Sequence, residues 1–183
     1  MTLVLVASLV PVKRHELLLR ALASAVSIGA DVRLQLVGDG PLRMHLEKLA
    51  TILGIEGRVD FFGHVADREI LAGVLDAADV FVMTSSTEGM PRSMIEGMAR
   101  GLPVLGSDVG GIAELLESDQ RIAGVDPQLW GQRIAELQSD VETMNEYSRR
   151  SHRVANAFEQ QILTARRQRI LSELAATVRN ETR

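Results

Sequence analysis

Short apolar runs alternate with amphipathic helical segments along most of this chain, and this alternation constrains the fold most strongly. The run Leu3–Ser8 is apolar almost throughout, as expected of a strand that is buried on both faces of a parallel sheet. The segment His15–Ile28 follows it, with leucines, alanines and a valine along one side at helical spacing. Five later runs are also predicted strands: Val32–Val37, Arg58–Phe62, Val80–Met83, Val104–Gly106 and Arg121–Val125.

Helical segments separate the predicted strands, and short loops join them. The remaining predicted crossover helices are Leu42–Leu53, Asp67–Ala77, Arg92–Arg100 and Gly111–Leu116. Strands alternating with helices in this way form parallel βαβ units with right-handed crossovers. The sequence therefore predicts an α/β fold, a Rossmann-like doubly wound parallel sheet of about six strands, over residues 1–126. A helical C-terminal tail is expected over about 127–183, with breaks near Asp140 and Asn156, and 1–183 is interpreted as a single domain.

Composition removes several classes of function. A net charge of −4 and an aromatic content of 3% argue against nucleic acid as a partner. The chain has no cysteine, which excludes a disulfide framework, a thiol nucleophile and a cysteine-based zinc site. We expect a cytoplasmic protein. Three histidines, His15, His45 and His152, fall among charged residues of predicted helices and are expected on the surface, whereas His64 falls in a candidate ligand loop.

Ligands of doubly wound sheets bind at the carboxyl ends of the strands, so the loops that follow the strands are the places to search. Lys13 follows the first strand and stands where the next helix begins. A cation beside a helix N-terminus favours a diphosphate, although a surface lysine would give the same pattern. The glycines of Gly38–Pro41 indicate a turn, and they would also let the backbone approach a ligand.

The segment 85–114 carries two glutamates at the positions that a nucleotide site would need. Glu88 lies in the loop after an apolar strand, and Glu96 lies one turn inside the following helix. The backbone N–H groups of Arg92 and Ser93, at the start of that helix, could bind a phosphate. A carboxylate is then well suited to accept hydrogen bonds from a ribose diol. The alternative is that both glutamates are solvated.

Other features of the same segment bear on its chemistry. The pair Gly110–Gly111 indicates either a tight start to a helix or a second anion cradle. No Asp-x-Asp motif is present, so Lys13 and helix N-termini, rather than a metal ion, are expected to meet leaving-group charge. No G-x-S-x-G elbow is present either, which argues against acyl chemistry. We therefore predict no metal ligands and no cofactor.

Taken in order, the motifs resemble a known family. The strings LVLVASLVPVK, VGDGP, RVDFFGHV and SSTEGMPRSMIEGMARGLPVLGSDVGGIAE are similar to the C-terminal, nucleotide-sugar-binding half of GT-B fold retaining glycosyltransferases of the group 1, family 4 type. The resemblance covers about residues 3–114. It implies that Glu88 is the catalytic-site residue, contacting the hydroxyls of the transferred sugar, and that Glu96 holds the ribose. Lys13 would bind the diphosphate with the N–H groups of Arg92 and Ser93.

The resemblance also assigns the remaining loops and exposes two departures. The turn at His64-Val65 would lie against the base, and Gly38 belongs to the GDGP turn of the donor site. Ser8 stands where the family usually has arginine, which removes one cation from the diphosphate site. Gly97 stands where alanine is usual, a change that weakens a helix by ~1 kcal/mol.

Complete members of the family have a second Rossmann-like domain that precedes this one and binds the acceptor, and this chain lacks it. The resemblance therefore implies the donor-binding half of a hexosyltransferase that works with retention and without a metal. We expect it to bind a nucleotide sugar and to be nearly inactive alone. Its further partner would be the missing N-terminal acceptor domain or a partner subunit.

Two other functions stay open at this point. A nucleotide-sugar 2-epimerase shares the fold and would form the epimer without an acceptor. A non-catalytic nucleotide-sugar-binding subunit would co-purify with a separate acceptor domain. The C-terminal arginines are expected to form a solvated helix face, and the alternatives are docking on the missing domain or peripheral contact with anionic lipid; they are Arg149, Arg150, Arg153, Arg166, Arg167 and Arg169.

Overall fold

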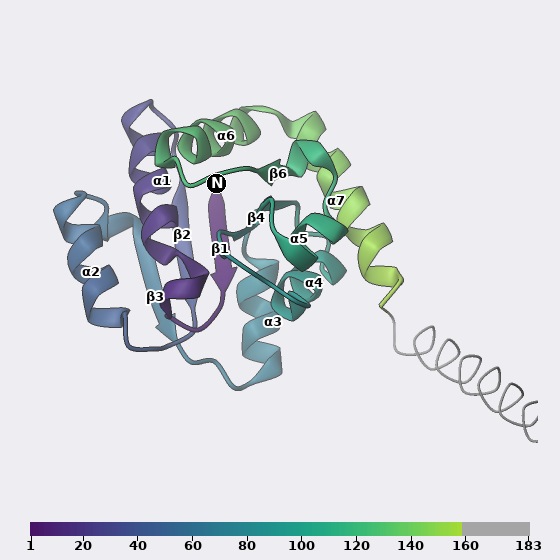
Figure 1. The fold of residues 1–183 in the computed structure, drawn as a ribbon, viewed down its shortest axis with the longest axis horizontal. Coiled ribbons are helices and arrows are strands. Elements are labelled where there is room, and N and C mark those ends of the chain that lie inside the picture. Colours follow the sequence, from purple (N-terminus) through teal and green to yellow (C-terminus); the bar gives the residue numbers. More distant parts are fainter. Residues whose placement is uncertain (159–183) are drawn as a thin grey trace, which may run out of the picture.

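The structure, a computed structural model, describes residues 1–158, and its centre is one parallel sheet (Figure 1). The six strands are β1 (Thr2–Val6), β2 (Arg33–Val37), β3 (Val59–Gly63), β4 (Val80–Met83), β5 (Val104–Ser107) and β6 (Arg121–Ile122). They lie in the order β3-β2-β1-β4-β5-β6, and every pairing is parallel. This order confirms the predicted doubly wound sheet, and it reverses direction between β1 and β4.

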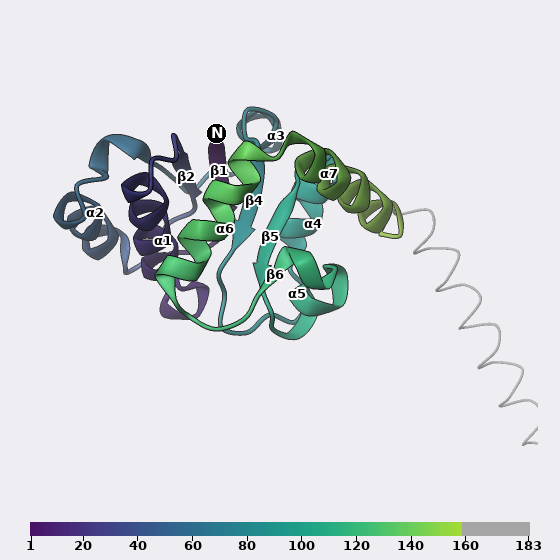
Figure 2. The same cartoon turned by 90° about the horizontal axis from the view of Figure 1, so that it is seen from above.

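Helices cover both faces of the sheet (Figure 2). One layer holds α1 (His15–Ser27), α2 (Arg43–Ile52) and α6 (Pro127–Ser139), and the other holds α3 (Arg68–Asp76), α4 (Arg92–Ala99) and α7 (Val141–Asn156). The short helix α5 (Gly110–Leu115) follows β5, and 3-10 turns occupy Pro11–Lys13 (η1), Glu56–Arg58 (η2) and Ser118–Gln120 (η3). Because α6 packs against α1, the start of the predicted C-terminal tail is part of the main helix layer.

The central strands are buried on both sides, which explains their continuous apolar sequence. All four residues of β4 are buried, and so are Leu3, Val4 and Leu5 of β1. A strand between two helix layers has no solvent face, so it shows no alternation of polar residues. The final strand is shorter than predicted because Gly124, with a φ of +82°, turns the chain away after Ile122.

Two glycines allow close packing between neighbouring elements. A Cβ on Gly131 of α6 would lie 2.6 Å from Cβ of Ser24 on α1. A Cβ on Gly97 of α4 would lie 2.7 Å from Cδ2 of the buried Phe81 ring on β4. The glycine that departs from the family pattern therefore has a packing reason, since it makes room for an aromatic ring beneath the helix.

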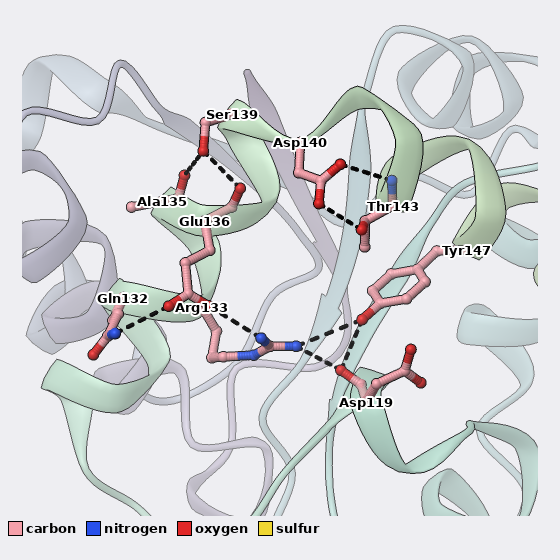
Figure 3. A network of polar contacts seen from close by, with 9 residues as sticks. All are labelled: Asp119, Gln132, Arg133, Ala135, Glu136, Ser139, Asp140, Thr143 and Tyr147. Carbon is pink, nitrogen blue, oxygen red and sulfur yellow. Dashed lines mark hydrogen bonds and ion pairs between the residues drawn. The ribbon is translucent and has the colours of Figure 1, made fainter.

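A polar corner joins α6 to α7 and to the turn before β6 (Figure 3). The chain bends at Asp140, as predicted, where the Asp140 carboxylate accepts hydrogen bonds from the Thr143 N–H at 2.9 Å and the Thr143 hydroxyl at 2.6 Å. The hydroxyl of Tyr147 donates to the Asp119 carbonyl at 2.8 Å. The break predicted near Asn156 coincides with the end of α7, and the helix predicted beyond it lies outside the described residues.

Candidate functional site

The loops that follow β1 and β4 lie side by side at the carboxyl edge of the sheet, the lower edge in Figure 1. β1 and β4 are neighbours, paired through Leu3 with Val80 and Val4 with Phe81. They are also the two strands between which the strand order reverses. Ligands of doubly wound sheets bind in the crevice at such a switch point.

Lys13 and Glu88 form an ion pair across this switch point. The ammonium of Lys13 contacts Oε1 of Glu88, and the Ser85 hydroxyl donates to the same oxygen at 2.8 Å. The side chains of Lys13 and Glu88 are 23% and 11% exposed, so both are shielded yet reachable from solvent. Within residues 1–158, no hydrogen bond reaches the second oxygen of Glu88, Oε2. The site thus offers a cation and one unoccupied carboxylate oxygen side by side.

The pair of glycines at the start of α5 seats the backbone of Glu88. The N–H of Gly111 donates to the Glu88 carbonyl at 2.9 Å. A Cβ on Gly110 would lie 2.3 Å from that carbonyl oxygen, and one on Gly111 would lie 1.7 Å from the oxygen of Gly89. These glycines therefore let two loops of the protein touch, which favours the structural alternative over an anion cradle.

The glycine turn after β2 has a similar role beside β1. Gly38 has a φ of +139°, and a Cβ there would lie 2.1 Å from the Ala7 carbonyl oxygen. The N–H of Leu9 donates to the Asp39 carbonyl at 3.0 Å, so the two loops support each other. Ser8, between them, is exposed. Gly38 contacts its own chain, and the predicted role for it at a ligand stays a prediction.

Helix α4 offers fewer free N–H groups than the sequence predicts. The N–H of Arg92 donates to the Met90 carbonyl at 2.9 Å, so in this structure it is not free for a phosphate. Ser93 is the second residue of the helix, where N–H groups have no partner within the helix. The side chain of Arg92 is exposed, and that of Ser93 is half-buried.

Glu96 lies one turn further along α4, and no contact joins it to the Lys13–Glu88 pair within the described chain. Its exposed side chain lines a hollow of about 470 Å³ between α3 and α4, which Arg68 also lines. Val65, half-buried, and the exposed His64 lie between β3 and α3. The structure therefore brings Lys13 and Glu88 together and leaves Glu96 in the hollow between α3 and α4, without a contact to that pair.

Sequence reasoning missed the hydroxyl side chains that surround the ion pair. Ser85 contacts Glu88 directly, while Thr84 and Ser86 hydrogen-bond the backbone of residues 12–14. Thr84 and Ser85 are completely buried. A run of hydroxyl residues between a strand and a glutamate was the available signal, since buried hydroxyls need hydrogen-bond partners.

His15 is buried, so the prediction that it lies on the surface is wrong. It is 1% exposed, and neither ring nitrogen has a hydrogen-bond partner in the described chain. Burial, aided by the positive charge of Lys13, lowers the pKa of His15 to about 4. His15 is therefore neutral at pH 7. His45 and His152 are exposed, as expected, and His64 in the candidate ligand loop is exposed as well.

The arginine-rich segment is less uniform than predicted. Arg149 and Arg153 are exposed, whereas Arg150 pairs with Asp119 at 2.7 Å and with Glu146, and lies over the Tyr147 ring. The other predicted arginines, Arg166, Arg167 and Arg169, lie outside the described residues.

Over residues 1–158, none of the helices combines the length and apolar character that a bilayer crossing needs. Over the same residues, no three His, Asp or Glu side chains converge as metal ligands would.

Comparison with known proteins relates this geometry to a family. The family model described as "Glycosyl transferases group 1" matches residues 1–140. A mannosyltransferase of Mycobacterium tuberculosis, named as GDP-mannose-dependent and acting on phosphatidylinositol dimannoside, is 37% identical over 99 residues, or 54% of this chain and 25% of that protein. The lipopolysaccharide core glycosyltransferase LpsE of Rhizobium meliloti is 47% identical over 85 residues, which cover 46% of this chain and 24% of LpsE.

A solved structure extends the similarity to nearly the whole chain. The crystal structure of Anabaena HepE in complex with UDP and glucose superposes with a TM-score of 0.81 at 26% identity, covering 96% of this chain and 48% of HepE. This chain thus spans about half of HepE and about a quarter of the first curated relatives that it matches.

Proposed function

We propose, from the premise that this chain belongs to the group 1 glycosyl transferases, that it is the donor-binding half of a hexosyltransferase that uses a nucleoside diphosphate sugar. The observation that carries the proposal is the Lys13–Glu88 pair, which stands between the two strands where the sheet reverses its order. A cation and a carboxylate at that point suit a ligand that has a diphosphate next to a polyol.

Each site residue then has a role in holding the donor. Lys13 binds the diphosphate, helped by the N–H of Ser93 at the start of α4. Glu88 accepts hydrogen bonds from hydroxyls of the transferred sugar through Oε2, while the Ser85 hydroxyl holds Oε1. Glu96 holds the ribose diol from the hollow between α3 and α4, and Val65 lies against the base.

The proposed chemistry needs no nucleophile from the protein. The leaving diphosphate assists the acceptor on the same face of the sugar, which gives retention of configuration. Lys13 stabilises the negative charge that develops on the diphosphate, and the sequence has no Asp-x-Asp motif to bring a metal ion to it. Catalysis is then positioning combined with electrostatic stabilisation.

The relatives support both the donor class and the need for a second half. One relative is named as GDP-mannose-dependent, and the HepE structure holds UDP and glucose. Because this chain spans about a quarter to a half of these proteins, we propose that an acceptor domain or partner subunit completes the site. We also propose that the exposed Arg149 and Arg153 contact anionic lipid. This proposal is contradicted if the amount of protein that sediments with liposomes does not change with their anionic lipid content.

Calorimetric titration of the full chain with UDP, GDP and ADP, and with their sugar conjugates, tests the donor site. We expect one base to bind, and Lys13→Met to weaken that binding by about 30-fold or more, because a charge-assisted contact to phosphate is lost. Lys48→Met, an exposed lysine on α2, is the matched control and should bind as the wild type does. A folded wild-type chain that gives no heat with any of these ligands contradicts the proposal.

Product analysis tests the reaction. Incubated with the donor that binds, the chain alone should transfer almost no sugar, and a supplied acceptor half should raise transfer. Formation of the 2-epimer of the donor without any acceptor would identify an epimerase in place of a transferase.

A further inference from the structure

The segment that carries Lys13 is attached to the β4 loop by hydrogen bonds from two hydroxyl residues. The Thr84 hydroxyl lies 2.9 Å from the Lys13 carbonyl and 3.2 Å from the Arg14 carbonyl. Ser86 donates to the Val12 carbonyl through its N–H at 2.8 Å and through its hydroxyl at 3.2 Å. Three consecutive carbonyls, of residues 12–14, thus face two hydroxyl residues of a segment about 70 positions away.

These hydrogen bonds join the segments that follow β1 and β4, beyond the residues that pair in the sheet. The Cα register pairs β1 with β4 at Leu3 with Val80 and at Val4 with Phe81, near the start of both strands. The chain then continues to Lys13 with no strand pairing to β4. Thr84 follows β4 directly and is 0% exposed, so its hydroxyl is available to the protein rather than to solvent or ligand. Its hydrogen bonds therefore join the two segments beyond the last paired residues of β1 and β4.

The backbone at Lys13 is tightly turned, and its shape depends on such support. Arg14 has a φ of +51°, the only positive φ of a non-glycine residue in the described chain. Residues other than glycine hold this conformation only where the surrounding structure fixes it. Here the Arg14 N–H donates to the Pro11 carbonyl at 3.0 Å, and Thr84 contacts the carbonyl of Arg14. The direction in which Lys13 leaves this turn is therefore set partly by Thr84.

We propose that Thr84 is a positioning residue for Lys13, with Ser86 in a supporting role, and this inference rests on the proposed donor site. Thr84 does not touch the ligand. Its hydroxyl holds the carbonyls of Lys13 and Arg14, on either side of the Arg14 Cα, so that the Lys13 ammonium stands beside Glu88, where the diphosphate binds. Loss of the hydroxyl lets the turn relax and moves the cation, while the base subsite at Val65 and the ribose subsite at Glu96 stay in place.

The test compares Thr84→Val, which keeps the shape and removes the hydroxyl, with Thr84→Ser, which keeps the hydroxyl. The measured quantities are the dissociation constants of the nucleoside diphosphate that binds the wild type and of the matching monophosphate. We expect Thr84→Val to weaken diphosphate binding about tenfold and monophosphate binding less than about twofold, because only the former depends fully on Lys13. Thr84→Ser should stay within about twofold of the wild type for both.

A double-mutant cycle makes the assignment specific. In a Lys13→Met background, Thr84→Val should have no further effect on diphosphate affinity, because the group that it positions is gone. Thr87→Val, an exposed threonine of the same loop, is the matched control and should change neither constant. Ser86→Ala, which removes only the hydroxyl contact and keeps the N–H contact, should weaken diphosphate binding about threefold, and it carries the test if Thr84→Val does not fold.

The outcomes separate the inference from the proposed function. If the wild type binds no nucleotide, both fail. The wild type could bind the nucleotide while Thr84→Val weakens the binding of diphosphate and monophosphate equally. Thr84→Val could also weaken diphosphate binding by the same factor in the wild-type and Lys13→Met backgrounds. In either case the donor site stands and the positioning role of Thr84 is wrong. Failure of Thr84→Ser to restore affinity would equally overturn the role of the hydroxyl.

Discussion

Two polar clusters join distant parts of this chain, and they differ in how their charges are partnered. At the switch point, Lys13 and Ser85 both contact one oxygen of Glu88. At the corner between α6 and α7, Arg133 donates to the Asp119 carbonyl at 2.6 Å and to Glu136 at 3.0 Å (Figure 3). Both clusters link segments far apart in sequence, yet only the first lies at the carboxyl ends of the central strands.

The difference indicates which cluster is structural. In the corner, the labelled groups bond one another: the Ser139 hydroxyl donates to the carbonyls of Ala135 and Glu136, and the N–H and hydroxyl of Thr143 donate to the two oxygens of Asp140. At the switch point, one carboxylate oxygen has no hydrogen bond from the described chain, and the cation has a single acidic partner. Polar groups that bond one another stabilise a bend, whereas a shielded carboxylate oxygen without a partner can accept hydrogen bonds from a ligand.

The largest expected effect, on the free energy of unfolding, comes from the glycine of α5 that packs against the loop after β4. Gly111→Ala places a Cβ 1.7 Å from the Gly89 carbonyl oxygen, so we expect a loss of about 3 kcal/mol or more in the free energy of unfolding, from overpacking against backbone. Urea denaturation measures it. Gly73→Ala, in a helix with nothing within 4 Å of the new Cβ, should instead stabilise the protein by about 1 kcal/mol. A Gly111→Ala protein as stable as the wild type would show that the loop is not held as described.

The second effect is a pH dependence between pH 7 and pH 5 that comes from the switch-point side. The pKa of His15 is lowered to about 4 in the folded state, from 6.5. The unfolded chain therefore binds the proton first, so the His15 contribution is complete above pH 6.5 and is lost as the pH falls towards 4. At pH 5 the loss should be about 2 kcal/mol, from about 1.4 kcal/mol per pH unit.

Denaturation midpoints of the wild type and His15→Gln at pH 7 and pH 5 measure this loss. The substituted protein should lose less stability over that interval, and the difference between the two proteins isolates His15 from other titrating groups. His152→Gln, which removes an exposed histidine, should follow the wild type. Equal pH profiles for the wild type and His15→Gln would refute the prediction.

A smaller effect is expected in the corner. Tyr147→Phe removes the hydroxyl that donates to the Asp119 carbonyl at 2.8 Å, so the free energy of unfolding should fall by about 1 kcal/mol. Nucleotide affinity should stay unchanged, because the corner does not lie at the carboxyl ends of the central strands. Thermal melts and the calorimetric titration measure the two quantities. A clear loss of affinity in Tyr147→Phe would remove the distinction between the clusters.

The smallest expected effect has the opposite sign. Arg14→Gly places glycine at a φ of +51°, where it is less strained, so we expect a gain of about 1 kcal/mol or less. Arg20→Gly, on an exposed position inside α1, should lose about 1 kcal/mol, because glycine weakens a helix interior. Destabilisation by both substitutions, seen in urea midpoints, would mean that the Arg14 side chain contributes more than its strained backbone costs.

Local patterns were sufficient to predict the architecture. Continuous apolar runs marked the buried strands, and helical spacing marked segments such as α1, because burial on one or both sides leaves a periodic trace in the sequence. The contact between Lys13 and Glu88 fits the same logic, since carboxyl ends of adjacent parallel strands share one edge.

The contacts between loops left no such trace. Thr84 and Ser85 are ordinary hydroxyl residues in sequence, and only the packing of two loops shows which acceptors they meet. His15 stands among charges in the sequence, yet it lies beneath the turn and is buried. Gly97 was interpreted from the sequence as a position that weakens a helix, whereas the structure shows that the Phe81 ring leaves no room for a Cβ there. Each of these depends on partners that are distant along the chain.

The ion pair at the switch point also bears on ligand selectivity. Because Glu88 already neutralises Lys13 at rest, an incoming anion must displace a tethered counter-ion instead of meeting a bare charge. Chloride or sulfate would gain little from that exchange, whereas a ligand that also offers hydroxyls can compensate the released carboxylate with new hydrogen bonds. For the donor site proposed above, we therefore expect the neutral Lys13–Glu88 pair to bind small inorganic anions only weakly.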